Sequence, residues 1–199
     1  MLRLFFCLAR SPISAAMATN PHYRLLTVEE FLGIRFPPDM KAELEDGVIR
    51  MMAGGNRAHA RVQMNLYRYL GSVLRGSGCR PYGSDMAVQT ADRAARYPDV
   101  TIDCGGQGDD PSDRLLNDPR VVIEVLSPST RDHDLRVKKP EYREVPSIRV
   151  VAFIDPEAET LSVSQRTEDG WTESLFARSD LRLPDYEIVV PHAEIFAWD

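Results

Sequence analysis

The sequence contains few cysteines, and none of them has the spacing of a metal site. Cys7, Cys79 and Cys104 are the only cysteines among 199 residues, and they lie far apart with no CxxC pair. This pattern argues against a disulfide framework and against a thiolate zinc site. We therefore expect the cysteines to be small, partly buried hydrophobic residues of a protein in a reducing cytoplasm.

Long hydrophobic runs and an excess of positive charge are also missing. No apolar stretch approaches the roughly 18 to 20 residues that cross a bilayer, which excludes an integral membrane protein. The chain carries 24 Lys and Arg against 30 Asp and Glu, a formal net charge of -6. This balance excludes a basic nucleic-acid-binding coat over the whole chain, although local basic stripes remain possible.

Histidine is scarce as well, which limits the metals that the chain could bind. No two of the four histidines have the i,i+4 spacing of a helical metal site; they are His22, His59, His133 and His192. A histidine-rich zinc or iron centre is therefore not expected. A bound metal would need oxygen ligands, which favours Mg²⁺ or Mn²⁺.

The chain has globular composition, with 43% hydrophobic and 27% charged residues, and its length fits one domain. The first 18 residues include Arg3 and Arg10 but no acid. An upstream translation start, with Met17 as the true start, is one interpretation; a weak targeting segment and a structured arm are the others. We treat 1–16 as a non-structural N-terminal extension and expect 17–199 to form a single domain.

Local signals predict a mixed α/β or α+β fold with a mixed central sheet flanked by helices. Thr27 and Glu30 form a capping box that begins a short helix, and Asp46-Gly47 is a hairpin turn within 42–52. The apolar pattern predicts further helices at 57–75 and 134–144. Strands are expected at 82–90, 97–104, 120–126, 149–155, 160–166 and 171–177, with a mobile loop at 105–118 and a second hairpin turn at Asp169-Gly170.

The predicted helix at 57–75 contains no acid, and its arginines gather on one face. Arg61, Arg68 and Arg75 are spaced seven residues apart, and Arg57 lies four residues before Arg61. Two interpretations stay open, a solvated helix face and a stripe that contacts phosphates.

Two carboxylates lie where burial would be costly. Glu124 is the single charge in the apolar run 121–126, and a buried carboxylate needs a cation, a metal or a proton. Asp99 begins the next apolar strand upstream. If the two strands are neighbours, Asp99, Glu124 and the carbonyl of Val125 form a hard oxygen site for Mg²⁺. The alternative is a structural salt bridge from Glu124 to an arginine.

At this point the sequence resembles a known group of nucleases. Pro98-Asp99 with Glu124-Val125-Leu126 resembles the PD-(D/E)XK nuclease signature. The longer string from Glu124 to Thr130, followed by Asp134, Lys138, Tyr142-Arg143 and 146–149, resembles the Uma-two-type restriction endonuclease family. The resemblance covers roughly 26–198.

The resemblance implies a restriction-endonuclease-like core that hydrolyses phosphodiester bonds with Mg²⁺. It makes Asp99 and Glu124 metal ligands and Glu43 an additional acid, with His59 as a weaker candidate. Leu126 stands where the signature has its lysine, and the family pattern implies that Lys138 on the following helix replaces it. Pro140, two residues later, puts the reach of Lys138 in question, because proline removes a helix hydrogen bond.

The resemblance therefore implies a Mg²⁺- or Mn²⁺-dependent endonuclease that acts on DNA, and a homodimer would suit the cutting of two strands. The segment 131–143 has five basic and three acidic residues. Its Arg131, Arg136 and Lys139 would join the arginines of the long helix as nucleic-acid contacts. The alternatives are a catalytically inactive nuclease-fold module with a binding or structural role, and a nuclease for RNA or a nucleotide-containing small molecule.

Overall fold

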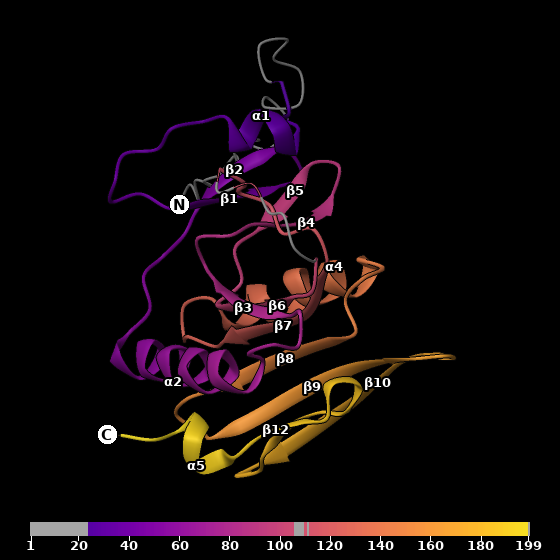
Figure 1. Cartoon of the computed structure of the whole chain (residues 1–199). Helices are drawn as coiled ribbons and strands as arrows, with labels where there is room; N and C mark the ends of the chain where they lie inside the picture. The colour runs from indigo at the N-terminus through magenta and orange to yellow at the C-terminus, as the bar shows by residue number, and fades with distance from the viewer. Residues whose placement is uncertain (1–23, 106–109, 111, 199) are drawn as a thin grey trace, which may run out of the picture.

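The structure, a computed structural model, describes residues 24–105, 110 and 112–198. Its centre is a six-stranded sheet in the order β10-β9-β8-β7-β6-β3 (Figure 1). The pair β7–β8 is parallel and the other neighbours are antiparallel. The bounds are β3 Arg80–Gly83, β6 Val100–Asp103, β7 Pro119–Val125, β8 Val150–Asp155, β9 Thr160–Thr167 and β10 Gly170–Ala177.

Helices cover both faces of this sheet, as the sequence predicts. Alternate residues of a strand point to opposite faces. Val121 and Ile123 of β7 therefore pack in the same cluster as Leu66 of α2 (Arg57–Val73), whereas Val122 packs with Tyr142 of α4 (Lys139–Glu144). Glu124 has the same parity as Val122, so its side chain belongs to the α4 face.

A second sheet, in the order β2-β1-β5-β4, lies above the central one in Figure 1 together with α1 (Val28–Leu32). Its strands are β1 Ala42–Glu45, β2 Val48–Met51, β4 Val88–Ala91 and β5 Ala94–Arg96. The capping box of Thr27 and Glu30 and the hairpin turn are confirmed. Asp46 and Gly47 both have positive φ, 49° and 81°, as a type I′ turn requires.

Some of the predicted elements are wrong. The single strand expected at 82–90 is two strands, β3 and β4, which belong to different sheets and are separated by a turn at Ser84-Asp85. The second hairpin turn is Glu168-Asp169, one residue earlier than expected. The sequence also failed to indicate β5 and the C-terminal elements β11 Leu181–Leu183, η3 Pro184–Tyr186, β12 Ile188–Val190 and α5 His192–Ile195.

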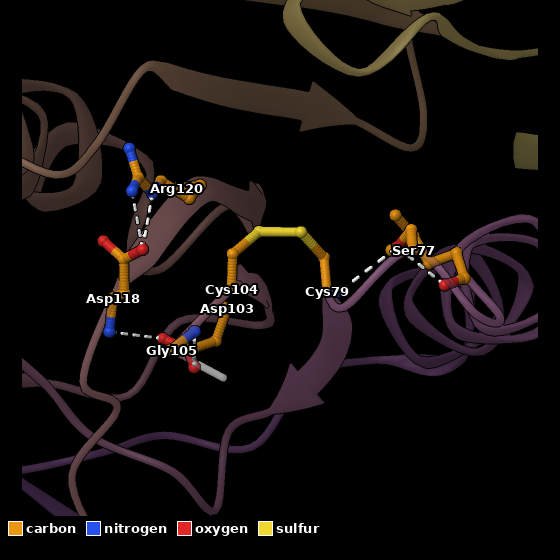
Figure 2. The surroundings of a disulfide bond; sticks show 8 residues. Ser77, Cys79, Asp103, Cys104, Gly105, Asp118 and Arg120 are labelled. Atoms are coloured by element: carbon orange, nitrogen blue, oxygen red, sulfur yellow. Dashed lines mark hydrogen bonds and ion pairs between the residues drawn. A yellow bond between two sulfur atoms is a disulfide. The ribbon is translucent and has the colours of Figure 1, made fainter. Parts of the chain in front are cut away.

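The expectation that the cysteines are free thiols is wrong for two of them. Cys79 and Cys104 form a disulfide, with their Cα atoms 4.1 Å apart (Figure 2). Cys79 precedes β3 and Cys104 follows β6, and these strands pair antiparallel with Arg80 opposite Asp103. Strand pairing therefore brings together two cysteines that are 25 residues apart in sequence.

The proposed extension at 1–16 and the Met17 start lie outside the described residues, as do positions 106–109 and 111 of the predicted mobile loop. Within the described part of the chain, no helix is both long enough and apolar enough to cross a bilayer.

Candidate active site

The two carboxylates predicted to converge do so because β6 and β7 are antiparallel neighbours. Val100 lies opposite Ile123, which places Asp99 beside Glu124. The backbone N–H of Asp99 donates to Glu124 Oε2 at 3.3 Å, and the N–H of Val125 donates to Asp99 Oδ2 at 2.8 Å. Backbone pairing thus sets the relative position of the two acids.

Lys138 reaches this pair from a helix that changes its winding. The helical segment begins earlier than predicted, with α3 (Arg131–His133), and continues as a π-helical turn over Asp134–Lys138 before α4. Pro140 falls in the first turn of α4, where the absence of its N–H is tolerated. Pro140 therefore does not keep Lys138 away from the sheet. The π turn lies directly before the proline, and the side chain of Lys138 is buried.

Three carboxylates surround the ammonium group of Lys138. Its Nζ lies 3.0 Å from Glu43 Oε1, 3.2 Å from Glu124 Oε1 and 3.4 Å from Asp134 Oδ1. Burial acts to lower the pKa of Lys138, but Glu124 and then Glu43 and Asp134 raise it above its ordinary value. Lys138 therefore remains a buried positive charge.

Glu124 is the acid whose protonation is most affected by its surroundings. Burial raises its pKa to about 8; Lys138 opposes this rise, and Asp99 adds to it. The hydroxyl of Tyr142 donates to Glu124 Oε1 at 2.7 Å. Burial and the nearby carboxylates of Glu124 and Glu43 raise the pKa of Tyr142 well above its ordinary value, which keeps this hydroxyl a donor.

Helix α2 supplies the groups that hold Asp99. His59 Nε2 lies 3.0 Å from Asp99 Oδ2, while Tyr67 and Gln63 donate to the Asp99 carbonyl at 2.5 Å and 3.0 Å. Burial acts to lower the pKa of His59, but the hydrogen bond to Asp99 outweighs it and raises the pKa. A Cβ on Gly55 would lie 2.6 Å from His59 Nδ1, so the backbone at Gly55 packs directly on this ring.

Glu43 is the partner that β1 supplies to Lys138. Its Oε1 also accepts from the N–H of Tyr97 at 3.1 Å, and its Oε2 accepts from Arg96 Nη1 at 3.3 Å. Arg96 is fully buried and binds Glu45 and Glu141 as well, at 3.0 Å and 2.6 Å. Glu43 therefore joins Lys138 to a buried ion network.

Asp99, Glu124 and Lys138 line one recess of about 410 Å³. Their side chains are 15%, 5% and 9% exposed, so a reacting bond must enter the recess to meet them. The wall of the recess also includes Val125, His59, Gln63 and Asp134. Glu43 is not among the described residues that line it. The recess therefore brings together four carboxylates, two ammonium groups and one imidazole, those of Asp39, Asp99, Glu124, Asp134, Lys41, Lys138 and His59.

The oxygen donors of the recess fit a hard divalent cation. Asp99 and Glu124 present carboxylates, and Val125 lines the same wall. Among the described residues, no group of three or more His, Cys, Asp or Glu side chains is arranged to hold a metal. One or two carboxylates supplemented by water and phosphate oxygens are the usual protein ligands of Mg²⁺, which matches this donor set.

The basic residues predicted to bind nucleic acid do not gather at the recess. The described lining includes none of Arg57, Arg61, Arg68, Arg75, Arg131, Arg136 and Lys139. Several have partners elsewhere. The guanidinium group of Arg61 lies 3.5 Å from the ring centroid of Trp198, Arg68 pairs with Glu194 at 2.8 Å, and Arg131 and Lys139 pair with Asp155 and Glu173.

Sequence reasoning missed several participants, among them Gln63 and Tyr67 of α2. Tyr142 and Asp134 belong to the family-like string but have no signal that distinguishes them from ordinary helix residues. The sequence indicates a role for Arg96 only weakly: it is a cation that follows the small apolar residues Ala94 and Ala95, just before a predicted strand.

Comparison with known families identifies the family of the chain. The Uma2 family model, described as "Putative restriction endonuclease", matches residues 28–191. The chain belongs to the Uma2 family. The matched segment spans every element that contributes to the recess, from β1 through α4.

Two relatives of this chain, from Synechocystis sp., are uncharacterized proteins. One, slr1290, is 29% identical over 161 residues, which cover 78% of this chain and 82% of the relative. The other, sll1609, is 29% identical over 134 residues, which cover 66% and 76%. The chain also resembles a solved structure described as a "putative nuclease belonging to DUF820" from Anabaena variabilis. The TM-score is 0.70 at 17% identity, with 87% and 98% of the two chains covered, which confirms the predicted fold.

Proposed function

We propose that this Uma2 protein is a metal-dependent endonuclease that hydrolyses phosphodiester bonds of DNA. The observation that carries the proposal is the placement of Lys138 Nζ 3.2 Å from Glu124, beside Asp99, in one recess. Two acids and one lysine are the side chains that the nuclease signature requires. Here the lysine comes from the π turn, because Leu126 occupies the usual position.

The residues of the recess have separate roles in this proposal. Asp99, Glu124 and the carbonyl of Val125 would hold Mg²⁺ or Mn²⁺. The bound cation supplies polarisation of the phosphate and a lower pKa for the attacking water. Lys138 stabilises the negative charge that develops on the phosphate. Tyr142 and Glu43 hold Glu124 and Lys138 in place through the hydrogen bonds and ion pairs described above.

A cleavage assay tests the proposal. Wild-type protein should cut plasmid DNA with Mg²⁺ or Mn²⁺ and not with EDTA. Asp99→Asn should lose cleavage, whereas Asp185→Asn, at an exposed ion pair with Arg149, should keep it. Cleavage that survives in Asp99→Asn, at the wild-type rate and in the same preparation, would rule out this site.

A catalytically inactive nuclease-fold module is the second candidate, and Leu126 is the observation that favours it. Leu126 is 5% exposed and packs in the cluster around Tyr142, so the signature position is part of the core. An inactive module would bind DNA with equal affinity in wild type and Asp99→Asn and would cut neither DNA nor RNA.

A further inference from the structure

A second cavity opens beside the recess and shares part of its wall. This cavity has a volume of about 150 Å³. The residues common to both are Lys41, Met52, Ser84 and Tyr97. Since Tyr97 is only two residues before Asp99 in the chain, the cavity lies next to the place where a phosphate would react.

Three aromatic side chains line this cavity: Phe31 lies at its base with 2% exposure, and Phe36 and Tyr97 are half-buried and offer ring surface. The centroid of the Phe31 ring is 5.9 Å from that of Phe36 and 6.4 Å from that of Tyr97. Leu32, Ile34 and Met40 add apolar surface. Flat aromatic molecules gain binding energy by stacking on such rings.

Polar groups line the same cavity and could meet the edge of a flat ligand. Lys41 Nζ lies 2.6 Å from Asp85 Oδ1, and Arg114 donates to the carbonyl of Leu32 at 2.8 Å. The residues that line this cavity include Lys41, Asp85, Arg114 and Ser84. Aromatic faces with donors and acceptors beside them are the features that recognise a nucleobase.

The depth of the reacting groups favours a strand that can enter the recess over a rigid paired duplex, whereas the charges of the recess attract neither one. The described lining of the recess contains three basic side chains, Lys41, Lys138 and His59, against four acids, Asp39, Asp99, Glu124 and Asp134. The predicted arginine contacts lie elsewhere, so a duplex would meet no continuous basic track in this recess. A recess with buried carboxylates beside an aromatic cavity can instead accept one nucleotide whose base is unstacked from its neighbours.

We infer that the cavity formed by Phe31, Phe36 and Tyr97 binds one unstacked nucleobase of the strand whose phosphodiester lies at Asp99, Glu124 and Lys138. The inference rests on the proposed function and adds a substrate class, single-stranded or locally unpaired DNA. Stacking in the cavity would position the adjacent phosphate in the recess.

A binding cycle tests the inference on the full chain. The probe is a single-stranded oligothymidylate in which one abasic residue is moved through each position, with Ca²⁺ as the hard cation. Loss of one stacked base should weaken binding roughly 5- to 150-fold at one position. Phe36→Ala should weaken binding of the intact strand to a similar extent and have little further effect on the abasic strand, because both changes remove the same contact.

Matched variants separate this contact from general destabilisation. Phe36→Tyr keeps the ring and should bind like wild type. Phe176→Ala removes an exposed ring from β10, outside both cavities, and should also bind like wild type. A duplex with a mismatched pair should bind more tightly than the fully paired duplex, since unpairing then costs less.

The outcomes distinguish the inference from the proposed function. Additive losses for Phe36→Ala and the abasic residue, or equal binding of abasic and intact strands, would overturn the inference while metal-dependent cleavage persists. A wild-type protein that binds neither strand nor duplex would overturn both.

Discussion

Lys138 Nζ lies 3.2 Å from Glu124 Oε1, although the two residues come from a helix and a strand that are separated by the segment 126–130. Leu126, two residues after Glu124 on β7, is buried in the core instead. Under the proposed function, the π turn therefore supplies the lysine that the nuclease signature places at position 126.

The first prediction concerns Lys138 and its neighbour Lys139. Lys138→Ala should lower the cleavage rate by two to three decades, the usual effect of removing a donor aimed at developing charge. It should also destabilise the fold by about 3 to 5 kcal/mol, because buried acids lose their partner. Lys139→Ala loses its pair with the half-exposed Glu173 and the packing of its stem, but leaves no acid buried without a partner, so it should cost less, about 1 kcal/mol.

Single-turnover cleavage, measured well below each melting temperature, checks this prediction. Equal rates for the two variants would show that Lys138 has no special part in cleavage and is a structural ion-pair partner of the buried acids.

The second prediction concerns the metal site. Because Asp99 and Glu124 offer hard oxygen ligands, Mg²⁺ or Mn²⁺ at a hundredfold excess over its dissociation constant should stabilise the fold by about 2.7 kcal/mol. Thermal melts should show this shift in wild type and in Glu144→Gln, whose side chain is exposed on α4. A shift of the same size in Glu124→Gln would remove Glu124 from the site.

The third prediction concerns Arg96. Arg96→Met leaves Glu43, Glu45 and Glu141 without their buried cation and should destabilise the fold by about 3 to 5 kcal/mol. Arg120→Met, which removes a half-exposed pair with Asp118, should cost about 1 kcal/mol or less. Urea unfolding gives both values, and a similar small loss for Arg96→Met would show that the network contributes little.

The fourth prediction concerns pH and Glu45. Partial burial acts to raise the pKa of Glu45, but hydrogen bonds from His133 and Arg96 outweigh it and lower the pKa. A lowered folded-state pKa contributes stability that is present above the unfolded value, about 4.3, and is lost as pH falls through the folded value. Between pH 5 and 3, Glu45→Gln should therefore lose less unfolding free energy than wild type.

Glu168→Gln, at an exposed turn, is the control for the pH series and should follow the wild-type curve. If Glu45→Gln also follows that curve, the interactions of Glu45 with His133 and Arg96 do not contribute to acid stability.

The fifth prediction concerns the disulfide. For cysteines 25 residues apart, chain-entropy reasoning assigns a bond such as Cys79–Cys104 about 3.5 kcal/mol of stability. A reductant should lower the wild-type unfolding free energy by about this amount. The double variant Cys79→Ala/Cys104→Ala should have the lower value with and without reductant; a reductant effect that persists in it would point away from this bond.

Patterns within a few residues of the chain predict the local part of this structure correctly. The capping box of Thr27 and Glu30, the hairpin turn at Asp46-Gly47 and the long helix from Arg57 depend on backbone geometry and short-range periodicity, which the sequence contains directly. The cost of burying the lone charge of Glu124 likewise predicts that it needs a partner, before the partner is known.

Only chain packing decides which partner each of these groups meets. The pairing of β3 with β6 joins Cys79 to Cys104, and the π turn ahead of Pro140 brings Lys138 to Glu124. Arg96 forms ion pairs with acids of both β1 and α4. These contacts depend on strand register and helix winding over long sequence separations, and no local periodicity encodes them. The free-energy cost of burying each charge is therefore determined only when the elements pack together and supply its partner.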